Sequence, residues 1–209
     1  MKKLLSLVLA LLLALSFAGC SGSTAMTEAN VTATVDSAFD ALKHFDTKKL
    51  EKYVDSKTLS VIITYANKHD QFADLGKALF KNLEYSIESI DLDAKTVTVS
   101  VRNKDLKDTA SAFTKALVSK YSALQMLSLL NNETWLNTSL NSLTDSIAIA
   151  KMQSAPVSVT LTVTAGKKNL MLGFDDTAEN AVSGGALQAV KSLTSGLTGS
   201  KSTTESTSN

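Results

Sequence analysis

The stretch Leu83-Glu-Tyr-Ser-Ile-Glu-Ser-Ile-Asp-Leu-Asp-Ala-Lys-Thr-Val-Thr-Val-Ser-Val101 contains two runs in which apolar and polar residues alternate. Successive side chains of a β-strand point to opposite faces, so each run predicts a strand with one buried face. The polar residues 93–95 between the runs are typical of a turn, and Asp91 and Asp93 are best interpreted as turn residues. The sequence therefore predicts a β-hairpin over residues 83–101.

A second hairpin is predicted further along the chain. Pro156, the only proline, precedes an alternating run from Val157 to Val163, and a strand start tolerates the missing amide of proline. Residues 165–168 then form a turn, and Leu170, Leu172 and Phe174 form the return strand.

The segments around the two hairpins have helical spacing. Asp46-Thr47 and Asp55-Ser56 are expected to cap two of the early helices. One helix is expected from residue 105 to about residue 130, and Asn131-Asn132 separates it from the next. A last helix is expected after residues 175–177, with Gly184-Gly185 in its middle. The apolar residues of the helices before the first hairpin are Val31, Val35, Phe39, Leu42, Leu50, Tyr53, Val54, Leu59, Ile62, Ile63, Ala66, Phe72, Leu75, Leu79 and Phe80.

This order of elements predicts an α+β domain. Helices must cover one face of an antiparallel sheet of about four strands. Such a sheet, curved round a long helix, forms a cone with an open mouth.

The N-terminus has the three parts of a secretory signal: the basic start Met1-Lys2-Lys3, an apolar run over residues 4–18, and a small residue before Cys20. The run is shorter than the about 20 apolar residues that span a bilayer. We therefore expect this segment to be removed.

The residues Phe17-Ala18-Gly19-Cys20 resemble the lipobox of bacterial lipoproteins. This resemblance implies cleavage between Gly19 and Cys20, and diacylglyceryl and acyl groups on Cys20 that hold the protein on the extracytoplasmic face of a cell membrane. The alternative is an ordinary secreted protein with a cysteine at the boundary. Because Cys20 is the only cysteine, no intramolecular disulfide can form, and lipidation accounts for it better than a lone thiol does. Ser21 leaves open which membrane holds the anchor in a cell with two.

Four segments follow from these patterns: a signal peptide at 1–19, a lipidated flexible tether at 20–30, a single domain at 31–193, and a tail at 194–209. The tail is rich in Ser, Thr and Gly, and it lacks the apolar residues that would offset the entropy cost of ordering it.

Charge argues against nucleic-acid binding. The chain has 21 basic and 20 acidic residues. Removal of Lys2 and Lys3 leaves 19 against 20, a formal net charge of −1. Proteins that bind nucleic acids need a basic surface.

The stretch Val35-Asp-Ser-Ala-Phe-Asp-Ala-Leu-Lys-His-Phe-Asp46, the hairpin over 87–101 and the closing Asn180-Ala-Val-Ser-Gly-Gly185 resemble small bacterial lipoproteins with a nuclear-transport-factor-2-like (cystatin-like) fold, mostly of unknown function. The resemblance covers most of residues 31–190. One departure is that the last strand lacks the Trp common near Leu172 in such families.

Candidate site residues are few. Enzymes on cone folds use a carboxylate beside Tyr, His or Asp, and no such set converges in the sequence. His69 precedes Asp70 in a polar stretch typical of an exposed helix junction, and His44 lies at a helix end, where its charge would offset the carbonyl groups. Two scattered histidines do not make a metal site, and we expect no metal and no cofactor. The aromatic residues Tyr53, Tyr65, Tyr121 and Trp135 are candidates for lining a pocket, although aromatics at helical spacing usually belong to the core.

Two functions remain open at this point. The first is a non-enzymatic binding or interaction module on a lipid tether, whose partner is a small apolar ligand, another envelope protein or a second copy paired through the sheet face. The second is a cone-fold enzyme, similar to isomerases or dehydratases, that acts on an envelope or extracellular metabolite. The lack of a convergent catalytic set favours the first.

Overall fold

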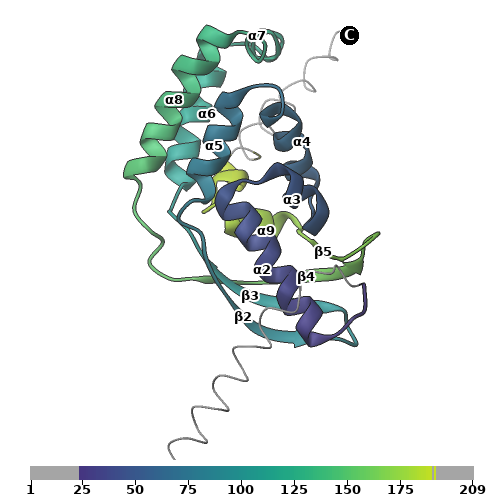
Figure 1. Cartoon of the computed structure of the whole chain (residues 1–209). Helices are drawn as coiled ribbons and strands as arrows, with labels where there is room; N and C mark the ends of the chain where they lie inside the picture. Colours follow the sequence, from purple (N-terminus) through teal and green to yellow (C-terminus); the bar gives the residue numbers. More distant parts are fainter. Residues whose placement is uncertain (1–23, 190, 192–209) are drawn as a thin grey trace, which may run out of the picture.

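The structure is a computed structural model, which describes residues 24–189 and Lys191 (Figure 1). The predicted signal peptide at 1–19, the lipidation site Cys20 and the tail at 194–209 lie outside the described residues. In the part that is described, no helix has both the length and the apolar character that a membrane span requires.

The first helix, α2 (Glu28–His44), lies across one face of the sheet (Figure 1). It begins within the segment predicted as tether, because the Thr27 hydroxyl accepts a hydrogen bond from the backbone N–H of Asn30 and so caps the helix. Val35 and Phe39 are fully buried, as their spacing predicted. Helix α2 therefore forms the centre of the core.

The next elements are α3 (Thr47–Tyr53), β1 (Val54–Asp55), α4 (Lys57–Ala66) and α5 (Asp70–Phe80). Asp46 caps α3 and Ser56 caps α4, so both predicted caps are confirmed. Val54 was predicted in a helix, and this is wrong because its backbone pairs with a strand from the other end of the domain, Val54 opposite Leu172.

The sheet contains β2 (Glu84–Asp91), β3 (Thr96–Arg102), β4 (Val157–Ala165) and β5 (Leu170–Gly173) besides β1, in the order β1-β5-β4-β3-β2. Neighbouring strands from β5 to β2 are antiparallel, whereas β1 is parallel to β5. The α+β class and both hairpins are confirmed. The expected sheet of about four antiparallel strands is corrected to an open, mixed sheet of five among the described residues.

Strand β2 contains a β-bulge. The pairing register shifts between Ile87 and Ser89, so that Glu88 is the extra residue. The bulge returns the next apolar residues, Ile90 and Leu92, to the side of the core that Tyr85 and Ile87 contact. The bulge explains why the apolar residues stand at odd positions up to Ile87 and at even positions from Ile90 onward.

The two faces of the central strands differ in chemistry. The alternate residues Val97, Val99 and Val101 of β3 are fully buried, as is Leu161 of β4. The residues between them carry hydroxyl groups, and those of Thr98 and Thr160 are 3.3 Å apart. In the part of the chain that the structure describes, the helices thus cover one face of the sheet, as the alternation predicted.

A second helical layer lies away from the sheet and contains α6 (Lys107–Lys120), α7 (Ala123–Leu129) and α8 (Glu133–Ile149). The single helix predicted from residue 105 to about residue 130 is wrong, because the chain is extended at Tyr121 and a new helix starts after Ser122. The Ser122 hydroxyl and the Gln125 side chain form a capping box that stabilises this start.

The last labelled helix, α9 (Asp176–Val182), is capped by Asp175 as predicted. It does not continue through the glycines, because Gly184 and Gly185 have positive φ angles of 61° and 85°. At Gly184, a Cβ atom would lie 1.8 Å from the Lys104 carbonyl oxygen. The expected last helix with both glycines in its middle is therefore wrong, because the helix ends at Val182 and the chain turns at the glycines.

Candidate functional site

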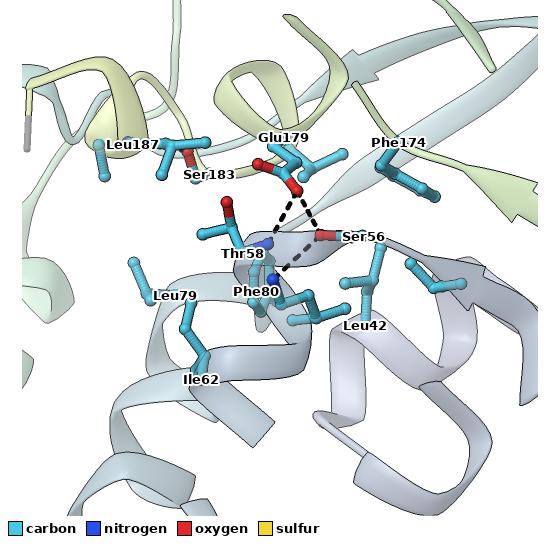
Figure 2. A pocket seen from close by; sticks show the side chains of 14 residues that line it. Leu42, Ser56, Thr58, Ile62, Leu79, Phe80, Phe174, Glu179, Ser183 and Leu187 are labelled. Carbon is cyan, nitrogen blue, oxygen red and sulfur yellow. Dashed lines mark hydrogen bonds between the residues drawn. The ribbon is translucent and has the colours of Figure 1, made fainter. Parts of the chain in front are cut away.

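A partly enclosed apolar cavity of about 290 Å³ lies among α2, α4, α5 and the chain around α9 (Figure 2). Its size is near the lower end of the range for small-molecule sites, about 300–1,000 Å³. We call it the first cavity. Its lining consists of Leu42, Val54, Ser56, Thr58, Leu59, Ile62, Leu79, Phe80, Phe174, Glu179, Val182, Ser183, Ala186 and Leu187.

The lining of the first cavity contains both buried and partly exposed residues. Leu42, Val54, Leu59, Phe80 and Val182 are buried and belong to the core, so they form the inner wall. The partly exposed residues are Thr58, Ile62, Leu79, Ser183, Ala186 and Leu187. Of these six, Thr58, Ile62, Ser183 and Leu187 frame the side of the cavity that is closer to solvent.

Glu179 is the acidic residue of this lining, and only 9% of it is exposed. Its side chain points from α9 toward the start of α4 (Figure 2). The Ser56 hydroxyl donates a hydrogen bond to Glu179 Oε1, and the backbone N–H of Thr58 donates a second, 3.4 Å long, to the same oxygen. Ser56 Oγ also accepts from the N–H of Leu59, so the hydroxyl links the carboxylate to the helix cap.

The other carboxylate oxygen has no partner. Glu179 Oε2 is buried and makes no hydrogen bond to the described residues. The lining of the first cavity includes no Lys, Arg or His from the part of the chain that the structure describes. The cavity thus contains a buried acceptor that its own walls leave unsatisfied.

Strand pairing explains how Glu179 reaches Ser56. Strands β1 and β5 run in parallel, and the N–H of Phe174 donates to the Asp55 carbonyl oxygen at 2.9 Å. Both strands therefore end at the same edge of the sheet, where α4 and α9 begin with the caps Ser56 and Asp175. The first turn of α9 then places Glu179 beside the N-terminus of α4.

A polar groove of about 700 Å³ adjoins the same carboxylate. Ser56, Thr58, Phe174 and Glu179 line both this groove and the first cavity, whereas Thr160 and Thr162 line only the groove. Glu179 thus stands at the border between an apolar space and a polar one.

A second apolar cavity, of about 380 Å³, lies within the layer of α5, α6, α7 and α8. Its walls include Phe72, Phe113, Met126 and Trp135. Leu79 and Ala186 line both this second cavity and the first, so these two side chains separate the two spaces.

The four predicted pocket residues lie apart from Glu179. Trp135 lines the second cavity, and the ring of Tyr121 packs edge-on against it with centroids 6.1 Å apart. Tyr65 packs on Phe72 with centroids 5.4 Å apart, and Tyr53 is partly buried against the core. Neither Tyr53 nor Tyr65 belongs to the lining of either apolar cavity.

Neither histidine lies in the first cavity. His69 Nδ1 is 2.8 Å from Glu133 Oε1, and Gln71 donates to Glu133 Oε2 and to Asn137. The hydrogen bonds from His69 and Gln71 lower the pKa of the Glu133 carboxyl group. This polar cluster joins the start of α5 to α8, so His69 is part of a helix contact.

His44 lies in the last turn of α2, where its Nδ1 is 2.9 Å from the Asp40 carbonyl oxygen. This position matches the interpretation of His44 as a helix-end residue. Over residues 24–189 and Lys191, no three His, Cys, Asp or Glu side chains are grouped so as to hold a metal ion.

Comparisons with protein-family models, curated proteins and solved structures find no match for this chain.

Sequence reasoning missed Glu179, although a local signal was present. Glu179 precedes Val182 by three residues and Ser183 by four, so all three share one face of a helix. A carboxylate on the face that carries a buried valine indicates a buried polar role. No local pattern indicated that Ser56 would lie opposite Glu179.

Proposed function

We propose that this protein is a lipid-anchored extracytoplasmic lipoprotein whose domain binds a small apolar ligand without transforming it. The observation that carries the proposal is the first cavity, whose lining is apolar except for one buried carboxylate and a few hydroxyl groups. Binding sites of this kind combine apolar walls with a few placed polar groups that fix the ligand's orientation.

The anchor part of the proposal rests on the lipobox-like residues Phe17 to Cys20. Two or more acyl chains attach a protein to a membrane durably, since each buried CH₂ contributes about 0.8 kcal/mol. A tether after Cys20 would hold the cavity close to the membrane, where apolar molecules concentrate.

The fold part of the proposal is a nuclear-transport-factor-2-like cone. A long helix lying across an open sheet supports it, as do the two hairpins in the expected order. In such a cone the space between helix and sheet accommodates ligands, and the first cavity opens beside this space.

Native mass spectrometry tests the binding function. The chain from residue 20, carrying Cys20→Ser to prevent lipidation, is purified and its native mass is compared with its denatured mass. We expect extra mass that is lost on denaturation, which indicates a co-purified ligand. A mass of one chain with no addition, also after incubation with an envelope lipid extract, would contradict the proposal.

Two matched variants locate the ligand. Thr58→Phe adds a ring to the lining of the first cavity and not of the second, whereas Thr64→Phe makes the same change at an exposed position on the same helix, α4. We expect the additional mass to disappear in the first variant and to persist in the second. A native mass of two chains would instead indicate that two copies pair, and the sheet face is then the surface to test. If an envelope protein co-purifies with the chain, the function is protein binding.

Glu179 also favours a second candidate, an enzyme similar to cone-fold isomerases and dehydratases. A buried carboxylate in an apolar cavity is the feature that such chemistry uses as a base. The other polar side chains of the lining are the hydroxyls of Ser56, Thr58 and Ser183. Conversion of an envelope metabolite by the wild-type chain but not by Glu179→Gln would establish this activity, and recovery of all metabolites unchanged would exclude it.

A further inference from the structure

We propose that the ligand of the first cavity is an amphiphile with an ammonium head group, which donates a hydrogen bond to Glu179 Oε2 while its apolar chain fills the cavity. This inference rests on the proposed binding function and adds the chemical class of the ligand.

The hydrogen bonds of Glu179 indicate which kind of ligand group can pair with its second carboxylate oxygen, Oε2. Among the described residues, Oε1 accepts from two donors, the Ser56 hydroxyl and the Thr58 amide, while Oε2 accepts from none. An ionised carboxylate can only accept hydrogen bonds. A buried acceptor without a partner is destabilising, so the missing group must be a donor.

The negative charge of Glu179 favours a hydrogen-bond donor that is positively charged. Buried charges in proteins are usually paired, because removing an unpaired ion from water is costly. The lining of the first cavity offers the carboxylate no positively charged side chain from the described residues. Two lysines line the adjoining polar groove, but Lys57 is exposed and Lys191 Nζ contacts Asp176 Oδ1 at 2.5 Å. A ligand with an ammonium group would supply the missing positive charge.

Hydroxyl groups in the lining fit the remaining protons of such a head group. An ammonium group on a primary amine has three N–H donors. One would reach Glu179 Oε2, and the Thr58 hydroxyl oxygen of the same lining can accept another. Ser183 Oγ donates to the Asn180 carbonyl oxygen and accepts from the N–H of Leu187, which leaves it one lone pair for the head group.

The position of Glu179 fixes how the ligand would lie. Because Glu179 lies between the polar groove and the apolar cavity, a head group bound there can remain near the groove while the chain extends inward. The inner wall is made of Leu42, Leu59 and Phe80, and beyond Leu79 and Ala186 lies the second cavity. Each additional methylene should tighten binding about fourfold until the space is full.

The test compares three ligands with one chain length and different head groups. Decylamine, decanol and decanoate are titrated below their micelle concentrations at pH 7 into the chain from residue 20 carrying Cys20→Ser, by isothermal titration calorimetry. We expect decylamine to bind at least about tenfold more tightly than decanol, and decanoate to bind most weakly, because two carboxylates repel each other.

Glu179→Gln is the matched isosteric variant. Its amide group is neutral and can donate a hydrogen bond, so we expect decylamine and decanol to bind it with affinities within about threefold of each other. Glu51→Gln is the control, since Glu51 is an exposed carboxylate on α3, and it should keep the wild-type order. Circular dichroism melting of each variant checks that it is folded.

The outcomes separate this inference from the proposed function. If none of the three ligands binds the wild-type protein, both the binding function and the inference are overturned. If all three bind equally, or decanoate binds best, the cavity binds apolar molecules but the ammonium assignment is wrong. If Glu179→Gln keeps the tenfold preference, Glu179 is not the acceptor. Should Glu179→Gln fail to fold, the order measured on the wild-type protein still decides the head-group chemistry.

Discussion

At the scale of single residues, the two glycines after α9 have different roles despite similar backbone angles. Gly184 lies against the Lys104 carbonyl oxygen, and its own carbonyl accepts from the N–H of Leu106 at 2.8 Å. At Gly185, an added Cβ would lie 3.2 Å from Lys107 Cβ and at ordinary contact distances of 3.7 and 3.8 Å from the Lys107 backbone. Gly184 thus permits the close approach of the chain after α9 to the chain before α6.

Comparing the stabilities of Gly184→Ala and Gly185→Ala distinguishes the cost of backbone strain from the cost of steric overlap. We expect Gly185→Ala to lower the free energy of unfolding by about 1–2 kcal/mol, the cost of a left-handed conformation for an L-residue. Gly184→Ala should lower it by at least about 3 kcal/mol, because a backbone oxygen cannot move aside as a flexible side chain can. Urea unfolding measures both values, and equal losses would refute the overlap.

Glu133 should make stability depend on pH in the acid range. Its pKa is lowered from the ordinary value of 4.5, first by the hydrogen bond from His69 and then by that from Gln71. A lowered carboxyl pKa means that stability is gained above 4.5 and lost as pH falls through the lower value in the folded state. We expect the wild-type protein to melt at a higher temperature than Glu133→Gln at pH 6, with the difference shrinking below pH 4.5.

The control for this pH effect is Glu51→Gln, which removes an exposed carboxylate from α3. Its melting temperature should follow that of the wild-type protein at every pH. A difference between wild type and Glu133→Gln that stays constant from pH 6 to pH 3 would contradict the linkage.

At the scale of helices and strands, capping residues predicted the starts of α3, α4 and α9. Asp46, Ser56, Asn132 and Asp175 each accept a hydrogen bond from the backbone N–H three residues later. These contacts are local, so the sequence reveals them directly. The start of α7 was missed because apolar residues continue at helical spacing through the break, although Ser122 and Gln125 have the spacing of a capping box.

Two of these caps should differ in their effect on stability. Among the described residues, Asp46 Oδ1 accepts a hydrogen bond only from the backbone N–H of Lys49. Asp46→Ala should therefore lower the free energy of unfolding by about 1 kcal/mol. Ser56 caps α4 and also donates to the buried Glu179, so Ser56→Ala should cost about 2–3 kcal/mol.

A double-mutant cycle with Glu179→Gln checks the second contribution. Chemical unfolding of Ser56→Ala, Glu179→Gln and the double variant should give a coupling energy above about 0.5 kcal/mol. The pair Asp46→Ala and Glu179→Gln should be additive. Additivity in both cycles would show that the contact between Ser56 and Glu179 does not contribute to stability.

At the scale of the whole molecule, the predicted lipid anchor can be tested apart from the fold. Cys20→Ala should abolish incorporation of labelled palmitate and release the protein from the membrane fraction, because only Cys20 carries a thiol. Globomycin, which inhibits the lipoprotein signal peptidase, should change the migration of the wild-type protein. Ser21→Ala is the matched control and should still be labelled. Unchanged migration with globomycin and no palmitate label on the wild-type chain would refute the anchor.

The sequence by itself determined the features that depend on near neighbours along the chain. Alternation predicted both hairpins, whereas the bulge at Glu88 appeared only in the structure. Helical spacing and caps predicted α2, α3, α4, α5 and the start of α9, although α9 ends before the glycines that were expected in its middle. These signals can be read from sequence because turns, caps and side-chain periods involve residues only a few positions apart.

The tertiary structure alone decided the candidate site. Ser56 and Glu179 are 123 residues apart and meet because β1 pairs in parallel with β5, which two short segments of sequence do not specify. The same pairing converts an expected helical residue, Val54, into a strand. Long-range pairing depends on how the whole core closes, and the burial of one carboxylate depends on which surfaces then cover it. The chain therefore encodes its elements locally, while the cavity and its unpaired carboxylate oxygen exist only in the folded molecule.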